Sequence, residues 1–279
     1  MKVNTVWVTP NAEEIVLYCA RVSSPNQDSK STKLIRYLID NKHWSPFELA
    51  SMCVEINTSR AISPQILRHR SFHFQEFSQR YASVEDNGVV IYDARRQDRK
   101  NRQNSIDDIP EFIKADWRER QQRAWGYAYL DYKWALDQGI AKECARMILP
   151  LSTKTRMYMH GTIRDWIHYI LVRTDSTAQK EHREIAAEIK LQFCLHFPIT
   201  SAALGWSFLD TLLSENCLWT SASDIASILS LVFLNCAWST PCRFMVSCAA
   251  SASFCATPPS TCERIYARIS QPTPLSRVS

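Results

Sequence analysis

Basic and aromatic side chains alternate through residues 68–81, which read RHRSFHFQEFSQRY. Three arginines, two histidines and one glutamate share these fourteen positions with four aromatic rings. A guanidinium group pairs with phosphate through two parallel donors and stays charged at any working pH, and aromatic rings offer flat surfaces that exclude water. Glu76 and Ser78 add an acceptor and a hydroxyl, which a phosphate alone does not require. The stretch therefore predicts a site for a ligand with phosphates, a sugar and a ring system, which is a nucleotide.

Two other interpretations use the same composition. A solvated basic loop whose rings face the core needs no ligand. An RNA-binding module would use the arginines for phosphates and the rings for stacking on bases. The basic residues do not continue into a long stripe, which argues against RNA but does not exclude it.

Length and composition narrow the class of protein. The chain has 279 residues, a net charge of +5 and a pI near 8.7, which suits one large domain, or a domain with an appendage, that binds small anions. The N-terminus lacks the apolar core of a signal peptide, and no run of about 18 apolar residues predicts a membrane helix. The ten cysteines form no C-x-x-C pair and lie in or beside apolar runs. We expect a cytoplasmic protein with reduced, buried cysteines and no metal site.

The elements before the basic stretch are predicted from apolar periodicity and helix-start signals. Asn11 and Glu14 form a capping-box pattern at the start of a helix, and Pro46 predicts a loop at 43–48. Ser63 and Pro64 start a short helix that carries the basic stretch at its end. The other predicted elements here are strands at 2–8 and 49–57 and a helix at 31–41.

Beyond the basic stretch, residues 85–110 are polar and predict a loop. The remaining predicted elements are an amphipathic helix at 111–138 ended by Gly139, a helix at 141–149 stopped by Pro150, a strand at 153–159 and a last helix at 177–196.

The segment 161–173, GTIRDWIHYILVR, predicts a helix whose capping box consists of Thr162 and Asp165. Arg164 and His168 are four residues apart and project together from one face. The core face is predicted from the i, i+3, i+4, i+7, i+8 rule to consist of Ile163, Trp166, Ile167, Ile170 and Leu171.

Five ordered blocks give the chain a family resemblance. RHR followed by seven residues, Ser78 and QRY resembles the signature of the flavin-dependent thymidylate synthases. The further blocks are HWSPFE at 43–48, ARMILPL at 145–151, GTIRDWIHYILVR at 161–173 and DSTAQKEHREIA at 175–186. The resemblance covers roughly residues 1–205.

The resemblance implies a fold, an activity and an assembly. The family converts dUMP to dTMP with methylenetetrahydrofolate as carbon donor, FAD as bound redox cofactor and NADPH as reductant. Its fold is α+β, with a central, mostly antiparallel sheet and surrounding helices, in a homotetramer whose subunits share active sites. The reduced flavin is taken to supply the hydride, so no cysteine nucleophile is expected. No membrane or nucleic-acid partner is implied.

The resemblance also assigns site residues by position. The positions that match FAD contacts are Ser45, Arg68, His69, Arg70, Glu76, Thr162, Ile163, Arg164 and His168. The positions that match dUMP contacts are Gln65, Arg68, Glu76, Ser78, Gln79, Arg80, Arg146 and Arg173. Arg173 is the catalytic match, because a guanidinium beside the pyrimidine favours its anion. Thr162 and His168 stand where some members have asparagine, and both can still form hydrogen bonds.

Residues 206–279 differ in composition from the rest of the chain. They contain no glycine or lysine and only eight charged residues, with six cysteines and fourteen serines. We predict a catalytic domain at 1–205 and an atypical tail at 206–279, which is a frameshift product, an unrelated fusion, a disordered segment or a genuine C-terminal segment. A membrane anchor is disfavoured because Arg243 and the pair Pro258–Pro259 interrupt the apolar stretches.

Overall fold

A computed structural model describes residues 1–84, 88–208 and 211 of the chain. The described residues lie in one compact unit, which spans Met1–Thr211 and contains every element below. Most of the predicted tail lies outside the described residues, so the prediction for it stays a prediction. In the part of the chain that is described, no helix is long and apolar enough to cross a membrane.

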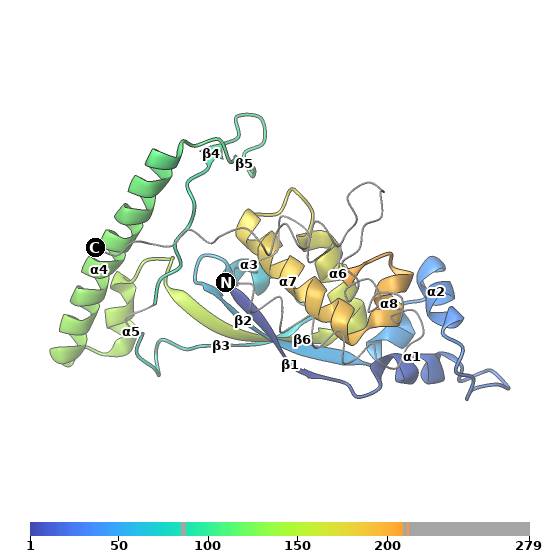
Figure 1. The fold of residues 1–279 in the computed structure, drawn as a ribbon. Coiled ribbons are helices and arrows are strands. Elements are labelled where there is room, and N and C mark those ends of the chain that lie inside the picture. Colours follow the sequence, from blue (N-terminus) through green and yellow to red (C-terminus); the bar gives the residue numbers. More distant parts are fainter. Residues whose placement is uncertain (85–87, 209–210, 212–279) are drawn as a thin grey trace, which may run out of the picture. The chain divides into compact units, whose positions relative to one another are not determined.

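Four antiparallel strands form the main sheet (Figure 1). Their order is β1 (Lys2–Val8), β2 (Ser51–Ser59), β6 (Lys154–Thr162) and β3 (His73–Glu76). The expected α+β class with an antiparallel sheet is confirmed, as are the three predicted strands, with β2 and β6 shifted by one to three residues. Strand β3 was not predicted, although it lies inside the basic stretch.

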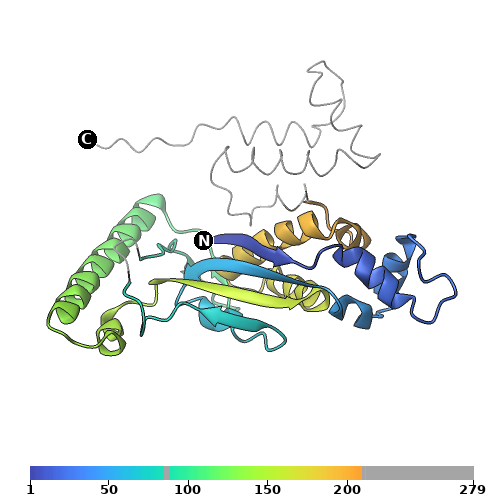
Figure 2. The same ribbon diagram turned by 90° about the horizontal axis from the view of Figure 1, so that it is seen from below.

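One face of the sheet is packed against helices, and the alternation of side chains shows why. Met52, Val54 and Ile56 of β2 are fully buried, as are Met157 and Met159 of β6. They pack in one core with residues of α6 (Ile163–Arg173) and α7 (Lys180–His196). Both views place these two helices against the same face of the sheet (Figures 1 and 2). The sheet therefore provides a rigid base for α6.

Most of the remaining helices match the predictions, but the helix at residues 198–203 was not predicted, and a pair of short strands lies within the loop predicted at 85–110. They are α1 (Ala12–Ala20), α2 (Lys33–Asp40), α3 (Ser63–Ile66), α4 (Glu111–Asp137), α5 (Lys142–Ala145) and α8 (Pro198–Ala203), with 3-10 helices η1 (Ser45–Glu48) and η2 (Arg146–Ile148) and a small ribbon of β4 (Arg96–Gln97) and β5 (Ser105–Ile106). The loop predicted at 43–48 is wrong, because Pro46 is accommodated in the first turn of η1 and accepts a backbone bond from Leu49. The helix predicted at 141–149 is instead split between α5 and η2.

The two predicted capping boxes have different outcomes. At α6, Asp165 N–H donates to the Thr162 hydroxyl at 3.2 Å and Thr162 N–H donates to the Asp165 carboxylate at 2.9 Å, so that box is confirmed. At α1, Asn11 has a φ of 52° and its side chain makes no capping bond. A side-chain cap needs an extended backbone at the N-cap residue, and the left-handed conformation of Asn11 does not supply one.

The predicted core face of α6 is wrong at one position. Ile163, Trp166, Ile167 and Ile170 are buried, but Leu171 is 55% exposed and Tyr169 is fully buried instead. At 100° per residue, Leu171 lies about 80° from Ile163 on one side of the helix, and the covered arc extends in the other direction, toward Tyr169. Tyr169 thereby faces α7, which matters for the site.

Candidate active site

Phe72 anchors the turn that carries Arg68, His69 and Arg70. Its ring is buried and lies edge-on to Trp166 of α6, with centroids 4.6 Å apart. A Cβ atom built on Gly161 would lie 2.5 Å from the Phe72 ring, so a glycine at the end of β6 is required for this approach. The basic turn is therefore fixed against the junction of β6 and α6.

His69 and Arg173 form the central pair of the site. Arg173 Nε donates to His69 Nε2 at 2.8 Å, and because a guanidinium only donates, His69 Nε2 carries no proton. Burial, followed by the charges of Arg173 and His168, lowers the pKa of His69 to about 4. His69 is therefore neutral near pH 7. The two terminal nitrogens of Arg173 bond to no described residue, which leaves that edge of the fork for a ligand.

Two cations flank this pair. Arg68 and Arg70 are exposed, and neither forms a hydrogen bond or ion pair with a residue that the structure describes. Arginines at a fixed turn without carboxylate partners are suited to bind an anion such as a phosphate.

The start of α6 contributes the other cofactor candidates. Arg164 and His168 are both exposed, as the four-residue spacing predicts. Arg164 pairs with Glu48 of η1, which places the start of α6 beside the short helix that contains Ser45. Arg164 and Arg173 are nine residues apart, which is about 14 Å along the helix axis. An extended dinucleotide lying along α6 could reach both ends.

The nucleotide candidates from the last residue of β3 onward form a second group. The Glu76 carboxylate is held by Arg60 at 2.9 Å and by the Thr155 hydroxyl at 2.8 Å. Gln79 is 6% exposed, and its side-chain nitrogen has no partner among the described residues. A buried amide donor without an acceptor is unusual in a folded protein, and a ligand oxygen would satisfy it. The second group therefore also points to a ligand.

Ser78 and Arg80 complete this second group. Ser78 Oγ accepts from the backbone N–H of Arg80 at 3.4 Å, and no described side-chain base is bonded to it, so the geometry fits a substrate contact better than a nucleophile. Arg80 pairs with Glu143 of α5 at 3.1 Å, and Arg146 follows in η2. Arg80 and Arg146 are thus carried by adjoining segments.

A cavity of about 520 Å³ adjoins the second group at one end of the sheet. Its lining includes Phe77, Ser83, Lys2, Lys154 and Arg156 and no carboxylate among the described residues. The three cations make the cavity suitable for an anionic ligand.

The structure thus places the predicted residues in two groups rather than one. Gln65, the basic turn and α6 make the first group, and the residues from Glu76 to Arg80 with Arg146 make the second. No hydrogen bond or ion pair between described residues joins the two groups. No described set of three or more potential metal ligands is placed to hold an ion.

Sequence reasoning missed several polar residues that support these groups. They are Arg60 at Glu76, and Tyr169, Gln179, Glu181 and His182 behind Gln65. A signal was present for Glu181 and His182, because these polar residues begin α7 at positions where its helical repeat turns toward the core, whereas Gln179 is exposed just before the helix.

An α+β unit with exposed guanidinium groups that pair with no described residue, a neutral histidine and a buried amide donor without a described acceptor is suited to bind a phosphorylated ligand, and the donor set fits the pyrophosphate of a flavin dinucleotide. The sequence model of the family described as "Thymidylate synthase complementing protein" matches residues 5–199. The chain belongs to this family, that of the flavin-dependent thymidylate synthases.

Individual relatives agree with this assignment. The chain is 54% identical to the flavin-dependent thymidylate synthase of Synechocystis sp. over 195 residues, covering 70% of this chain and 90% of that protein. It is 53% identical to a probable flavin-dependent thymidylate synthase of Paramecium bursaria Chlorella virus 1 over 198 residues, covering 70% of this chain and 91% of that protein. The structure is similar to the UMP/dUMP methylase PolB of Streptomyces cacaoi bound with 5-Br dUMP, with a TM-score of 0.63, 26% identity, and coverage of 73% and 94%.

Proposed function

We propose that the chain methylates dUMP to dTMP, with methylenetetrahydrofolate as carbon donor, bound FAD as redox cofactor and NADPH as reductant. The observation that carries the proposal is the bond between Arg173 and His69, with Arg68 and Arg70 next to it and paired with no described residue. Arg173 would then be the fixed cation that polarises the pyrimidine ring, and Arg68 and Arg70 would be the two cations that bind phosphates. The relatives named flavin-dependent thymidylate synthase, and the similar UMP/dUMP methylase bound with 5-Br dUMP, support the choice of substrate.

FAD would be held along α6. Arg68 and Arg70 would bind the pyrophosphate, and Ser45, Thr162, Ile163, Arg164 and His168 would line the remainder of its length. When bound and reduced, FAD supplies the hydride that the methylation requires. The neutral His69 would keep a donor on Nδ1 for this ligand, because Nε2 is committed to Arg173.

Arg173 would hold and polarise the pyrimidine. His69 fixes one side of its guanidinium plane, so the terminal nitrogens have a defined direction. A unit charge pair at 4 Å gains roughly 4 kcal/mol at an effective dielectric constant near 20, before desolvation costs, and this favours the ring anion. The other dUMP contacts would be made by Gln65, Arg68, Glu76, Ser78, Gln79, Arg80 and Arg146.

We infer that the active site is completed in a homotetramer. No hydrogen bond or ion pair between described residues joins the two groups of site residues, which is expected if different subunits contribute them. Helix α4 supports assembly, because one broad side of it exposes apolar side chains of Ile113, Trp117, Tyr127, Leu130 and Trp134. Exposed apolar surface of this extent is typical of protein interfaces. The four described cysteines are unpaired, which fits a cytoplasmic enzyme.

The absorbance spectrum of the purified protein tests the proposal and separates it from RNA binding. Bound flavin absorbs blue light, so the protein should be yellow, or become so on addition of FAD, and bleach with NADPH. A protein that takes up no FAD and instead retains RNA would refute the flavin assignment.

A further inference from the structure

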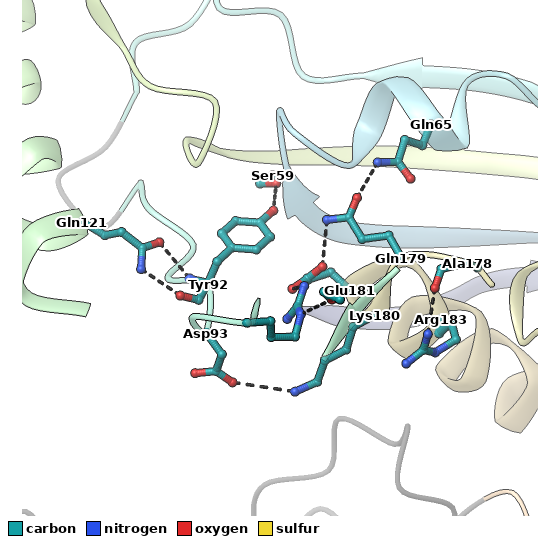
Figure 3. A network of polar contacts seen from close by, with 12 residues as sticks. Ser59, Gln65, Tyr92, Asp93, Gln121, Ala178, Gln179, Lys180, Glu181 and Arg183 are labelled. Carbon is teal, nitrogen blue, oxygen red and sulfur yellow. Dashed lines mark hydrogen bonds and ion pairs between the residues drawn. The ribbon is translucent and has the colours of Figure 1, made fainter. Parts of the chain in front are cut away.

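A chain of hydrogen bonds runs behind Gln65, a dUMP candidate under the proposed function (Figure 3). Gln65 Nε2 donates to Gln179 Oε1 at 2.7 Å, and Gln179 Nε2 donates to the Glu181 carboxylate at 2.8 Å. Arg95 pairs with the other carboxylate oxygen of Glu181 at 2.7 Å. Glu181 is 5% exposed, so this carboxylate is a fixed point in the interior.

The direction of this chain follows from chemistry alone. An ionised carboxylate only accepts, so the amide of Gln179 must turn its nitrogen to Glu181 and its oxygen to Gln65. The amide of Gln65 must then present its nitrogen to that oxygen. Reversing the Gln179 amide would set its oxygen against the carboxylate of Glu181 and its N–H group against the N–H group of Gln65.

The chain continues from the other end of Gln65. Its oxygen lies 3.4 Å from His182 Nδ1, at the long end of hydrogen bonding, and His182 Nε2 lies 3.1 Å from the Tyr169 hydroxyl. His182 and Tyr169 are fully buried. With the oxygen of Gln65 fixed on this side, His182 must carry its proton on Nδ1, and the Tyr169 hydroxyl must donate to Nε2. The Tyr169 ring in turn packs against the edge of His69, with centroids 4.8 Å apart.

We propose that Glu181 and Gln179 are positioning residues that orient the amide of Gln65 toward the nucleotide. The inference rests on the proposed function only for the identity of that nucleotide as dUMP. With one N–H bonded to Gln179, Gln65 keeps a second N–H as the donor for an oxygen of the nucleotide. Without the hydrogen bond to Gln179, the amide of Gln65 could rotate by 180° and present its oxygen to the nucleotide in place of its N–H group.

A thermodynamic cycle tests the inference. Gln179→Met keeps the length of the side chain but removes both bonds, and it should raise the KM for dUMP about tenfold, with kcat and flavin occupancy little changed. Gln65→Met should raise the KM at least as much. Since Gln179 acts through Gln65, the double variant should be no worse than Gln65→Met alone.

Gln121→Met is the matched control, because Gln121 also uses both ends of its amide, here on backbone atoms of Tyr92 and Trp117, but lies away from Gln65 (Figure 3). It should leave the KM unchanged. The inference would be overturned if Gln179→Met left the KM for dUMP unchanged, or if the effects of Gln179→Met and Gln65→Met on the KM were additive. The proposed function would still stand in either case, provided that the wild type converts dUMP to dTMP.

The tautomer of His182 gives a readout that needs no activity. Nitrogen NMR of ring-labelled histidines, with His182→Gln to assign the signal, should show the proton on Nδ1 in the wild type. A proton on Nε2 would reverse the chain and overturn the inference. A wild type that shows the Nδ1 proton but converts no dUMP would instead contradict the proposed function alone.

Discussion

Replacement of Arg173 separates the nucleotide role from the cofactor role. Arg173→Ala removes the 2.8 Å bond to His69 and the terminal nitrogens that are proposed to contact the pyrimidine. A hydrogen bond from a charged donor contributes about 1.5–3 kcal/mol, so loss of the contact to the pyrimidine should weaken dUMP binding about 10- to 100-fold. FAD should be retained, because Arg68 and Arg70 are unchanged and exposed.

The same variant should change the titration of His69. Burial is the largest cause of its lowered pKa and the charge of Arg173 is the second, and both weaken when the side chain is truncated. The pKa of His69 should therefore rise from about 4 toward its ordinary value, measured by NMR. Arg173→Lys should recover little, because one ammonium group cannot reproduce the fork that serves His69 and the ligand together.

Calorimetric titration with dUMP, beside the flavin absorbance of the same samples, decides the question. Arg96→Ala is a suitable control, because Arg96 is an exposed arginine paired with Asp108 outside the site. Loss of flavin with normal dUMP affinity in Arg173→Ala would refute the reasoning and assign Arg173 to the cofactor.

Four further predictions follow from the packing and the buried groups. Gly161→Ala should force Phe72 outward, lower the free energy of unfolding by about 1–3 kcal/mol in urea titrations and reduce FAD affinity; an unchanged variant would contradict the close approach. Replacing Cys19, Cys53, Cys144 and Cys194 together should reduce stability but preserve dTMP formation, and a folded, flavin-loaded but inactive variant would indicate a thiol mechanism. Truncation after Thr211 should leave a folded, FAD-binding protein. Truncation after Gly205 should give a lower Tm, because it removes Trp206, whose ring packs on that of Phe193 with centroids 5.6 Å apart. Equal Tm values for the two truncated proteins would show that Trp206 does not stabilise the fold. Burial, followed by the charges of Arg173 and His69, lowers the pKa of His182 to about 3, so the unfolded chain binds more protons than the folded chain below about pH 6.5. The free energy of unfolding should therefore fall as the pH is lowered from about 6.5 toward 3. His182→Gln should make this pH dependence weaker, and a variant with the same pH profile as the wild type would contradict the assignment.

The sequence predicts those elements whose signals are local. Helix α4 is a long stretch without proline that ends just before Gly139, where φ is 77°, and the α6 box is formed by two residues three positions apart. Asn11 fails as a cap because the backbone conformation that decides it is not written in residue type. Strand β3 was missed because it is only four residues long and gains its hydrogen bonds from β6, far along the chain.

The site follows the same division. The basic stretch predicts an anion-binding turn from its own residues, and Arg68 and Arg70 are exposed there. The bond between His69 and Arg173 joins residues 104 positions apart and depends on how α6 returns across the sheet. His182 looks like any polar residue of an amphipathic helix until Tyr169 and Gln65 are placed around it. The absence of a hydrogen bond between the described residues of the two groups could not be predicted, because it depends on tertiary geometry.

The central claim is that one site holds a flavin and dUMP so that the flavin's reducing equivalents are used to methylate the pyrimidine. An anaerobic single turnover tests it most directly, with FAD-loaded, chemically reduced protein mixed with dUMP and methylenetetrahydrofolate. The account predicts that about one dTMP is formed for each flavin reoxidised. Neither dTMP formation nor flavin reoxidation should occur when dUMP is omitted or when Arg173 is replaced by alanine. Formation of dTMP while the flavin stays reduced, or reoxidation of the flavin without dTMP, would contradict it.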